Sequence, residues 1–310
     1  MRALHTATTV ALTLTLASGG CARAQDTVGT LPEAAERRAS AIPVREVARS
    51  TVDTLFQQVT GLDVDSRGRV YVGDWFAARV AVLDSAGRLV GTVGRRGLGP
   101  GEFRSIRGVQ VLPGDSVLVF DPSAARLSVF APGQSRPAYV VNVGAAARSV
   151  PFYIHRTRGN DAFVAMFRPT FRSDDTARAT DRLRVLERDG RPRGEPIRTY
   201  PARGFLRVGN RNSFAVAPDP FGREGLYALG ADDRIHYLWS DSLAVETMDL
   251  RGRRTGGFSV RYRPPRIEAA DVESALEGMP PDMVRAFRPA LEDSLPERWP
   301  AARGLLADPE

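Results

Sequence analysis

The stretch GRRGLGPGEF (94–103) contains the glycine spacing that comes nearest to a ligand-binding motif in this sequence. Closely spaced glycines cradle a phosphate when a strand precedes them and a helix N-terminus follows. Here a proline interrupts the glycines, and the residues that follow predict another β-strand. We therefore interpret the stretch as a connection between two β-units, in which glycines adopt positive φ and a phenylalanine anchors the loop. The residues concerned are Gly97, Gly99, Pro100, Gly101 and Phe103.

Side chains suited to metal binding or nucleophilic catalysis are few and scattered along the sequence. Only two histidines, His155 and His236, follow the first 25 residues, whereas a zinc site takes three or four ligands. No Gly-x-Ser-x-Gly sequence is present, so no nucleophilic serine is predicted. The sequence identifies no particular catalytic residue, and we predict no cofactor. We keep Asp63 and His155 as weak candidates for a metal ligand, calcium included.

Two aromatic residues, Trp75 and Phe76, stand where a tight hairpin usually has small polar residues. Exposed aromatic side chains often anchor a ligand or a protein partner, but the same rings could fill the seam to a neighbouring unit. The sequence leaves both interpretations open. The polar stretch 168–180, which includes Arg172, is a long insertion relative to the repeats described below. Long insertions often carry function. We therefore name Trp75, Phe76 and Arg172 as candidate members of a contact surface.

These residues belong to a repeated unit of four short strands. Residues 59–93 alternate Val- and Leu-rich runs with turn residues, which predicts an antiparallel meander. The expected strands are 60–64, 69–73, 79–83 and 88–93. Residues 106–130 repeat the pattern, and we find a third copy over 152–190 and a fourth over 213–242.

An aspartate and an arginine recur around the hairpin between the second and third strands. Because they recur, we expect a structural role, in which the aspartate accepts backbone amides and the arginine binds it or a neighbouring unit. The recurring pairs are Asp74 and Arg79, Asp121 and Arg126, and, in shortened form, Asp232 and Arg234.

Four-stranded repeats of this length predict an all-β fold, a β-propeller of four-stranded antiparallel blades. The sequence GRVYVGD, followed by RVAVLDSAGRLVGTVGRRGLGPGEF, resembles NHL-type repeats and, over residues 43–310, six-bladed propellers that bacteria export. The resemblance implies a six-bladed ring when complete, of which this chain holds about four blades. Residues 303–310 match the first strand, so we expect the start of another blade and a chain truncated at its C-terminus. In similar propeller lactonases acidic residues bind calcium at the axis, which implies Asp63 and Asp65 as candidates.

Two further segments differ from the blades. Residues 267–295 have the apolar spacing of two short amphipathic helices, and we interpret them as a helical insertion in a propeller domain over 43–310. At the N-terminus, Arg2 precedes an apolar stretch shorter than the roughly 20 residues of a membrane span. Because small residues then offer a cleavage site, we predict a signal peptide over 1–24 and a flexible linker over 25–42.

Cys21 is the only cysteine in the chain, and two interpretations of it stay open. Cleavage after Ala24 would remove it, or the sequence SGGC would act as a lipobox and Cys21 would carry a lipid. Both interpretations predict an exported protein that is periplasmic, secreted or lipid-anchored at the cell envelope. No transmembrane segment is predicted, so membrane contact would occur only through a lipid on Cys21.

The formal net charge is +7, and all 43 basic residues are arginines, interspersed with 36 acidic residues. Nucleic-acid-binding proteins gather their basic residues into a patch or stripe, so we predict no nucleic-acid partner. The sequence therefore favours a non-catalytic binding or scaffold module for a protein or small-molecule ligand. The alternative is a calcium- or zinc-dependent hydrolase, lactonase or lyase with its site at the propeller axis.

Overall fold

The computed structural model describes residues 27–30, 56–144, 150–159, 161–168, 180–209, 214–305 and 307. The predicted signal peptide, Cys21, Arg172 and most of the insertion 168–180 lie outside these residues. Two compact units divide the chain. The first comprises residues 43–168 and 182–198, and the second comprises 199–310 together with 1–42 and 169–181.

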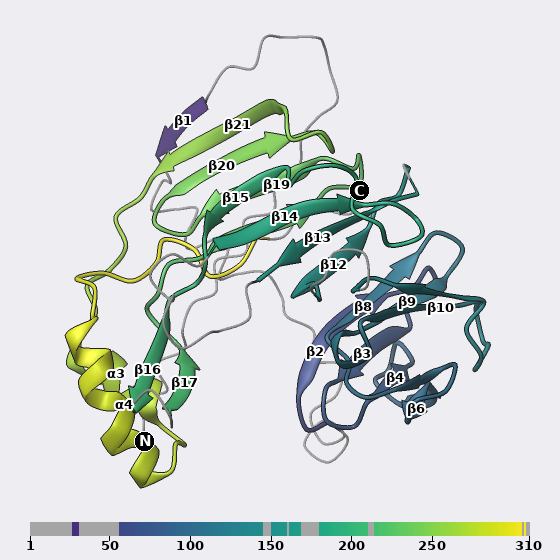
Figure 1. Cartoon of the computed structure of the whole chain (residues 1–310), viewed down its shortest axis with the longest axis horizontal. Coiled ribbons are helices and arrows are strands. Elements are labelled where there is room, and N and C mark those ends of the chain that lie inside the picture. The colour runs from purple at the N-terminus through teal and green to yellow at the C-terminus, as the bar shows by residue number, and fades with distance from the viewer. Residues whose placement is uncertain are drawn as a thin grey trace. The chain divides into compact units, whose positions relative to one another are not determined.

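The fold is all-β and consists of four antiparallel four-stranded blades of the β-propeller type, the fourth of which carries one additional parallel strand (Figure 1). This confirms the predicted fold class. Blade one contains β2 (Val59–Val64), β3 (Val70–Asp74), β4 (Arg79–Leu83) and β5 (Leu89–Val93). Blade two contains β8 (Gly108–Leu112), β9 (Ser116–Asp121), β10 (Arg126–Phe130) and β11 (Tyr139–Asn142). Blade three contains β12 (Tyr153–Arg156), β13 (Phe163–Phe167), β14 (Thr180–Leu186) and β15 (Arg198–Pro201).

Alternating residues of β9 bury against the two blades that flank it. Val117 and Val119 pack in one core cluster with Tyr71, Val80 and Val82 of blade one. Their neighbours Leu118 and Phe120 pack in a second cluster with residues of blade three, among them Phe163 and Phe167. Successive side chains of a strand point to opposite faces, so a blade between two others needs apolar residues at every position. This explains the continuous apolar runs in the sequence.

The first strands of blades one to three lie side by side. β2 contacts β8, and β8 contacts β12. The approach is close enough that a Cβ on Gly61 of β2 would lie 2.8 Å from the backbone nitrogen of Val109 in β8. A glycine is therefore required at this position by the neighbouring backbone rather than by its own φ angle.

Four hairpin turns share one pattern, in which an acidic residue is followed three positions later by a glycine and four positions later by an arginine. The amide of the acidic residue donates to the arginine carbonyl, and the glycine amide donates back to the acidic residue. Each glycine has a φ between 75° and 86°, which favours glycine over other residues. The four turns are Asp65–Arg69, Asp84–Arg88, Glu187–Arg191 and Asp249–Arg253.

In the second unit, blade four contains β18 (Gly225–Leu229), β19 (Ile235–Trp239), β20 (Leu243–Met248) and β21 (Arg254–Arg261). The predicted fourth copy, 213–242, is wrong in its first strand. β17 (Phe214–Pro218) instead pairs with β16 (Phe205–Gly209) in a separate two-stranded sheet. The reason is an apolar surface that this hairpin shares with helices rather than with a blade, as the next paragraph describes.

Two helices, α3 (Ala269–Leu276) and α4 (Pro281–Asp293), lie in the segment for which the sequence predicts helices. Phe287 and Leu291 of α4 are buried with Val272 and Leu276 of α3 against Leu206 of β16. β1 (Thr27–Thr30), inside the segment expected to be a flexible linker, pairs in parallel with β21. An edge strand such as β21 offers unpaired backbone groups to a further strand.

No helix in the described part of the chain is long and apolar enough to cross a membrane.

Candidate functional site

The recurring aspartates bind backbone amides at the end of each blade where the first strand begins. The carboxylate of Asp74 accepts the amides of Gln57 at 2.8 Å and Gln58 at 3.3 Å, just before β2. It also accepts the amides of Phe76 at 3.0 Å and Ala77 at 3.1 Å in the hairpin that follows β3. Burial alone would raise the pKa of Asp74, but these amides outweigh it and lower the pKa on balance.

Asp121 likewise binds backbone amides in blade two. Its carboxylate accepts the amide of Arg104 at 2.8 Å and that of Ala124 at 3.1 Å, and it lies 3.2 Å from the hydroxyl of Ser105. Ser240 has the equivalent place in blade four, where its hydroxyl accepts the amide of Glu224 at 2.8 Å. These contacts join the second strand of each blade to the segment that leads into its first strand.

The recurring arginines have different partners from one another. Arg79 lies opposite Asp74 in the β3–β4 ladder. Arg126 lies opposite Asp121, but its guanidinium donates to the carbonyls of Glu102 and Leu98, the latter at 3.5 Å. Arg126 therefore holds the glycine-rich connection between blades one and two.

That connection binds a carboxylate of its own. Within 94–103, the short strands β6 (Arg95–Arg96) and β7 (Glu102–Phe103) pair in parallel. The Glu102 carboxylate accepts the amides of Leu98 at 3.1 Å and Gly99 at 3.0 Å, and it pairs with Arg95 at 2.7 Å. The amide of Gly99 and the guanidinium of Arg95 lower the pKa of Glu102. The loop amides that could have met a phosphate are thus occupied by Glu102.

The surroundings of Gly97 and Phe103 show why the loop needs a glycine at one position and an aromatic ring at the other. A Cβ on Gly97, whose φ is 157°, would lie 2.1 Å from a carboxylate oxygen of Glu102. Phe103 is fully buried, and its ring centroid lies 6.0 Å from that of Phe130 in blade two. The same loop contains Gly99, Pro100 and Gly101. The amide of Gly99 already binds Glu102, and the described contacts of these residues give no evidence for a ligand site.

The two weak metal candidates lie in the first strands of different blades. The Asp63 carboxylate accepts the amides of Val64 at 2.8 Å and of Val111 in blade two at 2.7 Å. Gln110 stands at the equivalent position in blade two and binds the backbone of Arg156 in blade three, at 2.8 and 3.1 Å. Both residues therefore link neighbouring blades. Desolvation lowers the pKa of His155, and the negative charge of Asp63 partly offsets it.

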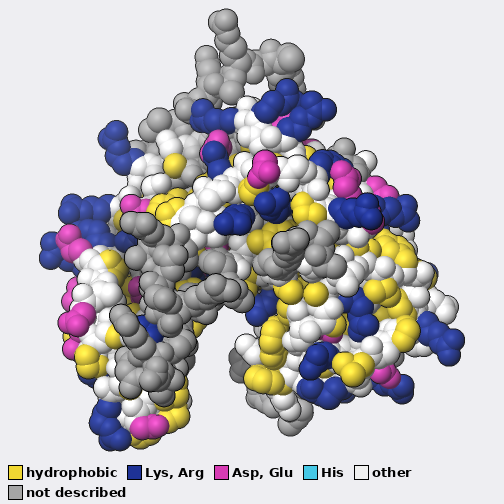
Figure 2. All heavy atoms as spheres, viewed as in Figure 1, with side chains coloured by type: hydrophobic (Ala, Val, Ile, Leu, Met, Phe, Trp, Pro, Cys, Tyr) yellow, Lys and Arg dark blue, Asp and Glu magenta, His cyan; other side chains and the backbone are white. Residues whose placement is uncertain are grey.

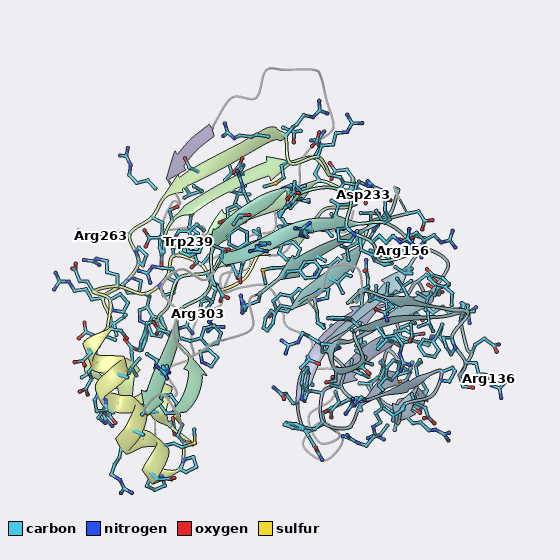
Figure 3. All side chains as sticks on the ribbon, viewed as in Figure 1. Arg136, Arg156, Asp233, Trp239, Arg263 and Arg303 are labelled. Carbon is cyan, nitrogen blue, oxygen red and sulfur yellow. The ribbon has the colours of Figure 1, made fainter. Side chains whose placement is uncertain are left out.

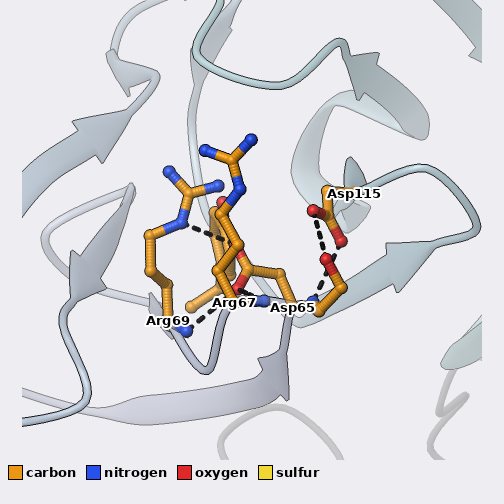
Figure 4. A network of polar contacts seen from close by, with 6 residues as sticks. Asp65, Arg67, Arg69 and Asp115 are labelled. Carbon is orange, nitrogen blue, oxygen red and sulfur yellow. Dashed lines mark hydrogen bonds and ion pairs between the residues drawn. The ribbon is translucent and has the colours of Figure 1, made fainter.

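Asp65 belongs to one of the four shared turns and not to a cluster of acids. It accepts the amides of Arg67 and Arg69, each at 2.9 Å, and pairs with the Arg69 guanidinium at 2.6 Å (Figure 4). On the neighbouring turn, Asp115 accepts the amide and the hydroxyl of Ser66 (Figure 4). Among the described residues, no three His, Cys, Asp or Glu side chains come together as metal ligands would.

The pair Asp232 and Arg234 does not have the position that the sequence predicts. It lies in the turn between β18 and β19, the first and second strands of blade four, where Asp232 pairs with Arg234 at 3.2 Å. The predicted position, between the second and third strands, belongs to Ser240. The prediction placed this pair one turn too late in the blade, because it counted residues 214–218 as the first strand of blade four.

An arginine lies close to two aromatic rings at the same end of the first three blades. The guanidinium of Arg107, just before β8, lies 4.9 Å from the ring centroid of Trp75 and 4.2 Å from that of Phe152. Trp75 follows β3 of blade one, and Phe152 precedes β12 of blade three. Trp75 thus contacts the next blade while remaining partly exposed, and Phe76 is 53% exposed. Figure 3 shows the side chains of these blades on the ribbon.

A second arginine joins this cluster from blade three. The guanidinium of Arg168, which is buried, also lies 4.2 Å from the ring centroid of Phe152. Phe152 in turn meets the ring of Tyr153 edge-on, with 4.7 Å between the centroids, and Tyr153 is 43% exposed. We name Trp75, Arg107, Phe152, Tyr153 and Arg168 the arginine–aromatic cluster.

Arg168 stands where the first two blades have an aspartate. In those blades the second strand ends at Asp74 and Asp121, whereas β13 ends at Phe167 and Arg168 follows it. At this end of the propeller a carboxylate in blades one and two is therefore replaced by a cation in blade three. The cluster therefore contains two guanidiniums, those of Arg107 and Arg168.

Sequence reasoning found Trp75 but missed the other members of the cluster. Arg107 and Arg168 are two of 43 arginines, and on the face shown in Figure 2 arginines are spread among acidic side chains. One signal was present: the repeat has Asp at the end of the second strand in blades one and two, and Arg168 breaks it in blade three.

No protein-family profile matches the chain, and no characterised protein sequence matches it. Three solved structures illustrate the structural similarity. A candidate exported protein of Bacteroides fragilis is 12% identical, with a TM-score of 0.43 over 73% of this chain and 57% of that one. A protein from Bacteroides caccae is 14% identical, with a TM-score of 0.35 over 46% of this chain and 48% of that one. Virginiamycin B lyase from Staphylococcus aureus is 11% identical, with a TM-score of 0.36 over 71% of this chain and 59% of that one.

The chain thus spans about half the length of the two Bacteroides proteins, at 48% and 57%. None of these similarities assigns an activity to this chain.

Proposed function

We propose that this protein is an exported, non-catalytic binding module whose ligand or partner contacts the blade end that carries the arginine–aromatic cluster. The observation behind the proposal is that half-buried and exposed aromatic rings and two guanidiniums gather there from three blades. Aromatic and arginine side chains are the types that most often dominate binding energy at interfaces.

The contacts of the other candidate residues support this choice. Asp63, Asp65, Asp74, Asp121 and Glu102 all bind backbone amides, so each carboxylate already has a structural partner. A residue of this kind stabilises the fold rather than reacting with a substrate. The cluster residues, in contrast, use ring faces and guanidiniums, which are suited to recognition.

We place the protein among NHL-type propellers and propose six blades for the complete ring, on the strength of the repeat and of the 94–103 motif. The signal sequence over 1–24 supports export, with processing either at Ala24 or by lipidation at Cys21. Lipidation would hold the binding end at the cell envelope, and cleavage would release the protein.

The test is a ligand-observed NMR screen of the purified full-length chain against neutral, cationic and anionic fragments. We expect hits whose saturation transfer is lost in Trp75→Ala and retained in Trp299→Ala, a tryptophan of the second unit. A screen in which Trp75→Ala changes no hit would contradict the proposed location.

Elemental analysis of the same protein decides the alternative function. Stoichiometric calcium or zinc would favour a metal-dependent hydrolase, lactonase or lyase and would contradict the non-catalytic proposal. Mass spectrometry of the mature N-terminus distinguishes cleavage from lipidation.

A further inference from the structure

We propose that the arginine–aromatic cluster is a receptor for an oxyanion carried on an aromatic or flat apolar body, with Arg107 as the residue that binds the anion. The inference rests on the proposed function and specifies the chemistry of its ligand. Four observations lead to it: the contacts of Arg107 with two rings, the lack of an acceptor for its side chain among the described residues, its local charge, and the exposed ring beside it.

Aromatic rings occupy positions over the Arg107 guanidinium, at 4.9 Å for Trp75 and 4.2 Å for Phe152. A guanidinium is planar, and its five N–H groups point outward in that plane. The two rings contact the guanidinium without supplying a conventional oxygen acceptor, so the N–H groups along its edge are the part that can bind one. An edge of this geometry matches the two oxygens of a carboxylate or phosphate, which accept two parallel N–H bonds.

Arg107 has no ion pair or side-chain hydrogen bond with any residue that the structure describes. Its situation differs from that of Arg69, Arg95 and Arg126, whose guanidiniums bind a carboxylate or a carbonyl within the protein. Arg107 is also partly buried, so its donors are partly withdrawn from water. Half-buried donors that have no acceptor among the described residues gain from a ligand that supplies one.

The positive charge at Arg107 and Arg168 also favours an anion as the ligand. Burial is the largest cause that lowers the pKa of Arg107, and the charge of Arg168 lowers it further, whereas the side chain of Tyr153 acts in the opposite direction. The two lowering effects destabilise the Arg107 cation, and an anion at its edge would relieve both. Arg168, which follows β13, has the place that Asp74 and Asp121 have in blades one and two.

The ring of Tyr153 supplies the surface for the apolar part of the ligand. It is 43% exposed and meets Phe152 edge-on, with 4.7 Å between the centroids. A ring attached to the bound oxyanion would reach this exposed face. We therefore expect an aromatic acid to bind more tightly than a small inorganic or aliphatic anion.

The experiment is calorimetric titration of the full-length protein with benzoate, phenyl phosphate, acetate, inorganic phosphate and the neutral benzamide. We expect benzoate or phenyl phosphate to bind, with benzamide at least about tenfold weaker because it has the same shape without the charge. The two aromatic anions distinguish a carboxylate ligand from a phosphate ligand. Benzamide binding as tightly as both anions would overturn the proposal.

The variants are Arg107→Gln, Arg107→Lys and, as the matched control, Arg136→Gln. Arg136 is an exposed arginine in the β10–β11 turn (Figure 3), so its substitution removes the same net charge elsewhere in the unit. We expect Arg107→Gln to weaken aromatic-anion binding about tenfold or more, because it removes the charge and the paired donors. Arg107→Lys retains the charge and the ring contacts but not the paired N–H edge, so it should restore binding only in part.

Equal weakening in Arg107→Gln and Arg136→Gln would overturn the proposal, because it would indicate a non-specific charge effect. Full affinity in Arg107→Gln would overturn it as well. Should Arg107→Gln fail to fold by circular dichroism, Arg107→Lys and benzamide still decide the outcome. Neutral or cationic fragments that bind at Trp75 while the anions do not would refute the oxyanion and leave the proposed binding module standing.

Discussion

Replacing Asp74 tests whether the recurring aspartate is a structural residue. Its side chain is 1% exposed and accepts four backbone amides, from Gln57, Gln58, Phe76 and Ala77, between 2.8 and 3.3 Å. A hydrogen bond to a charged group is worth about 1.5–3 kcal/mol. Water can replace the acceptor for amides near the surface, so we count the equivalent of one to two bonds. Asp74→Ala should then lower the free energy of unfolding by about 1.5–6 kcal/mol.

Asp74→Asn separates the two groups of amides. One oxygen of Asp74 binds Gln58, Phe76 and Ala77, and the other binds Gln57. The asparagine oxygen can keep the three-amide set, whereas its NH2 group would face the amide of Gln57. We expect Asp74→Asn to lose less than half as much stability as Asp74→Ala, measured by urea denaturation followed by circular dichroism at pH 7. The control is Asp189→Ala, since the Asp189 side chain is 59% exposed.

The pH dependence supplies a second readout. The pKa of Asp74 is lower in the folded protein than its ordinary value of 3.8, so the carboxylate stabilises the fold above about pH 4. This contribution is lost as pH falls through the folded-state pKa, and the gap between wild type and Asp74→Asn should narrow there. Asp74→Ala with unchanged unfolding would refute the structural role. Loss of ligand binding at unchanged stability would show that Asp74 belongs to a site.

Three further predictions concern other parts of the chain. Phe287→Ala, which empties a fully buried position in α4, should cost about 3–5 kcal/mol in a thermal melt, and a loss under 1 kcal/mol would contradict the α4 packing. Glu102→Gln should speed proteolytic cleavage within 97–101, because it weakens the acceptor for Leu98 and Gly99, and an unchanged cleavage rate would argue against that contact. Burial lowers the pKa of His236 below 6.5, so its NMR titration midpoint should lie below that value, and a midpoint above 6.5 would contradict its burial.

The arginine–aromatic cluster could be predicted from the sequence only in part. Trp75 drew attention because an aromatic ring in a hairpin tip is unusual, and the choice between a ligand contact and a seam to the next blade stayed open. The structure shows that the ring does contact the next blade, through Arg107, while remaining partly exposed. Arg107 and Phe152 lie inside the repeats, but no local pattern marks either of them as a member of a site.

Blade four shows that the sequence can predict a strand without predicting the partner with which it pairs. The apolar run over 214–218 has the composition of a first strand, and the sequence predicts it as one. Its partner is decided by the helices α3 and α4, whose buried Val272 and Phe287 pack against the β16–β17 hairpin. Strand propensity is local, whereas the choice of a partner depends on which apolar surfaces meet.

The sequence by itself determined the blade type, the strands of blade one and the first three strands of blades two and three, with the turns between them. Each of these depends on neighbours within a few residues: alternation of apolar side chains, or an aspartate that accepts amides two and four positions ahead, as Asp65 does. Only the tertiary structure decided which side chains meet at the blade end. Arg107, Phe152 and Trp75 come from three blades, and their contact exists because blade packing brings the first strands side by side.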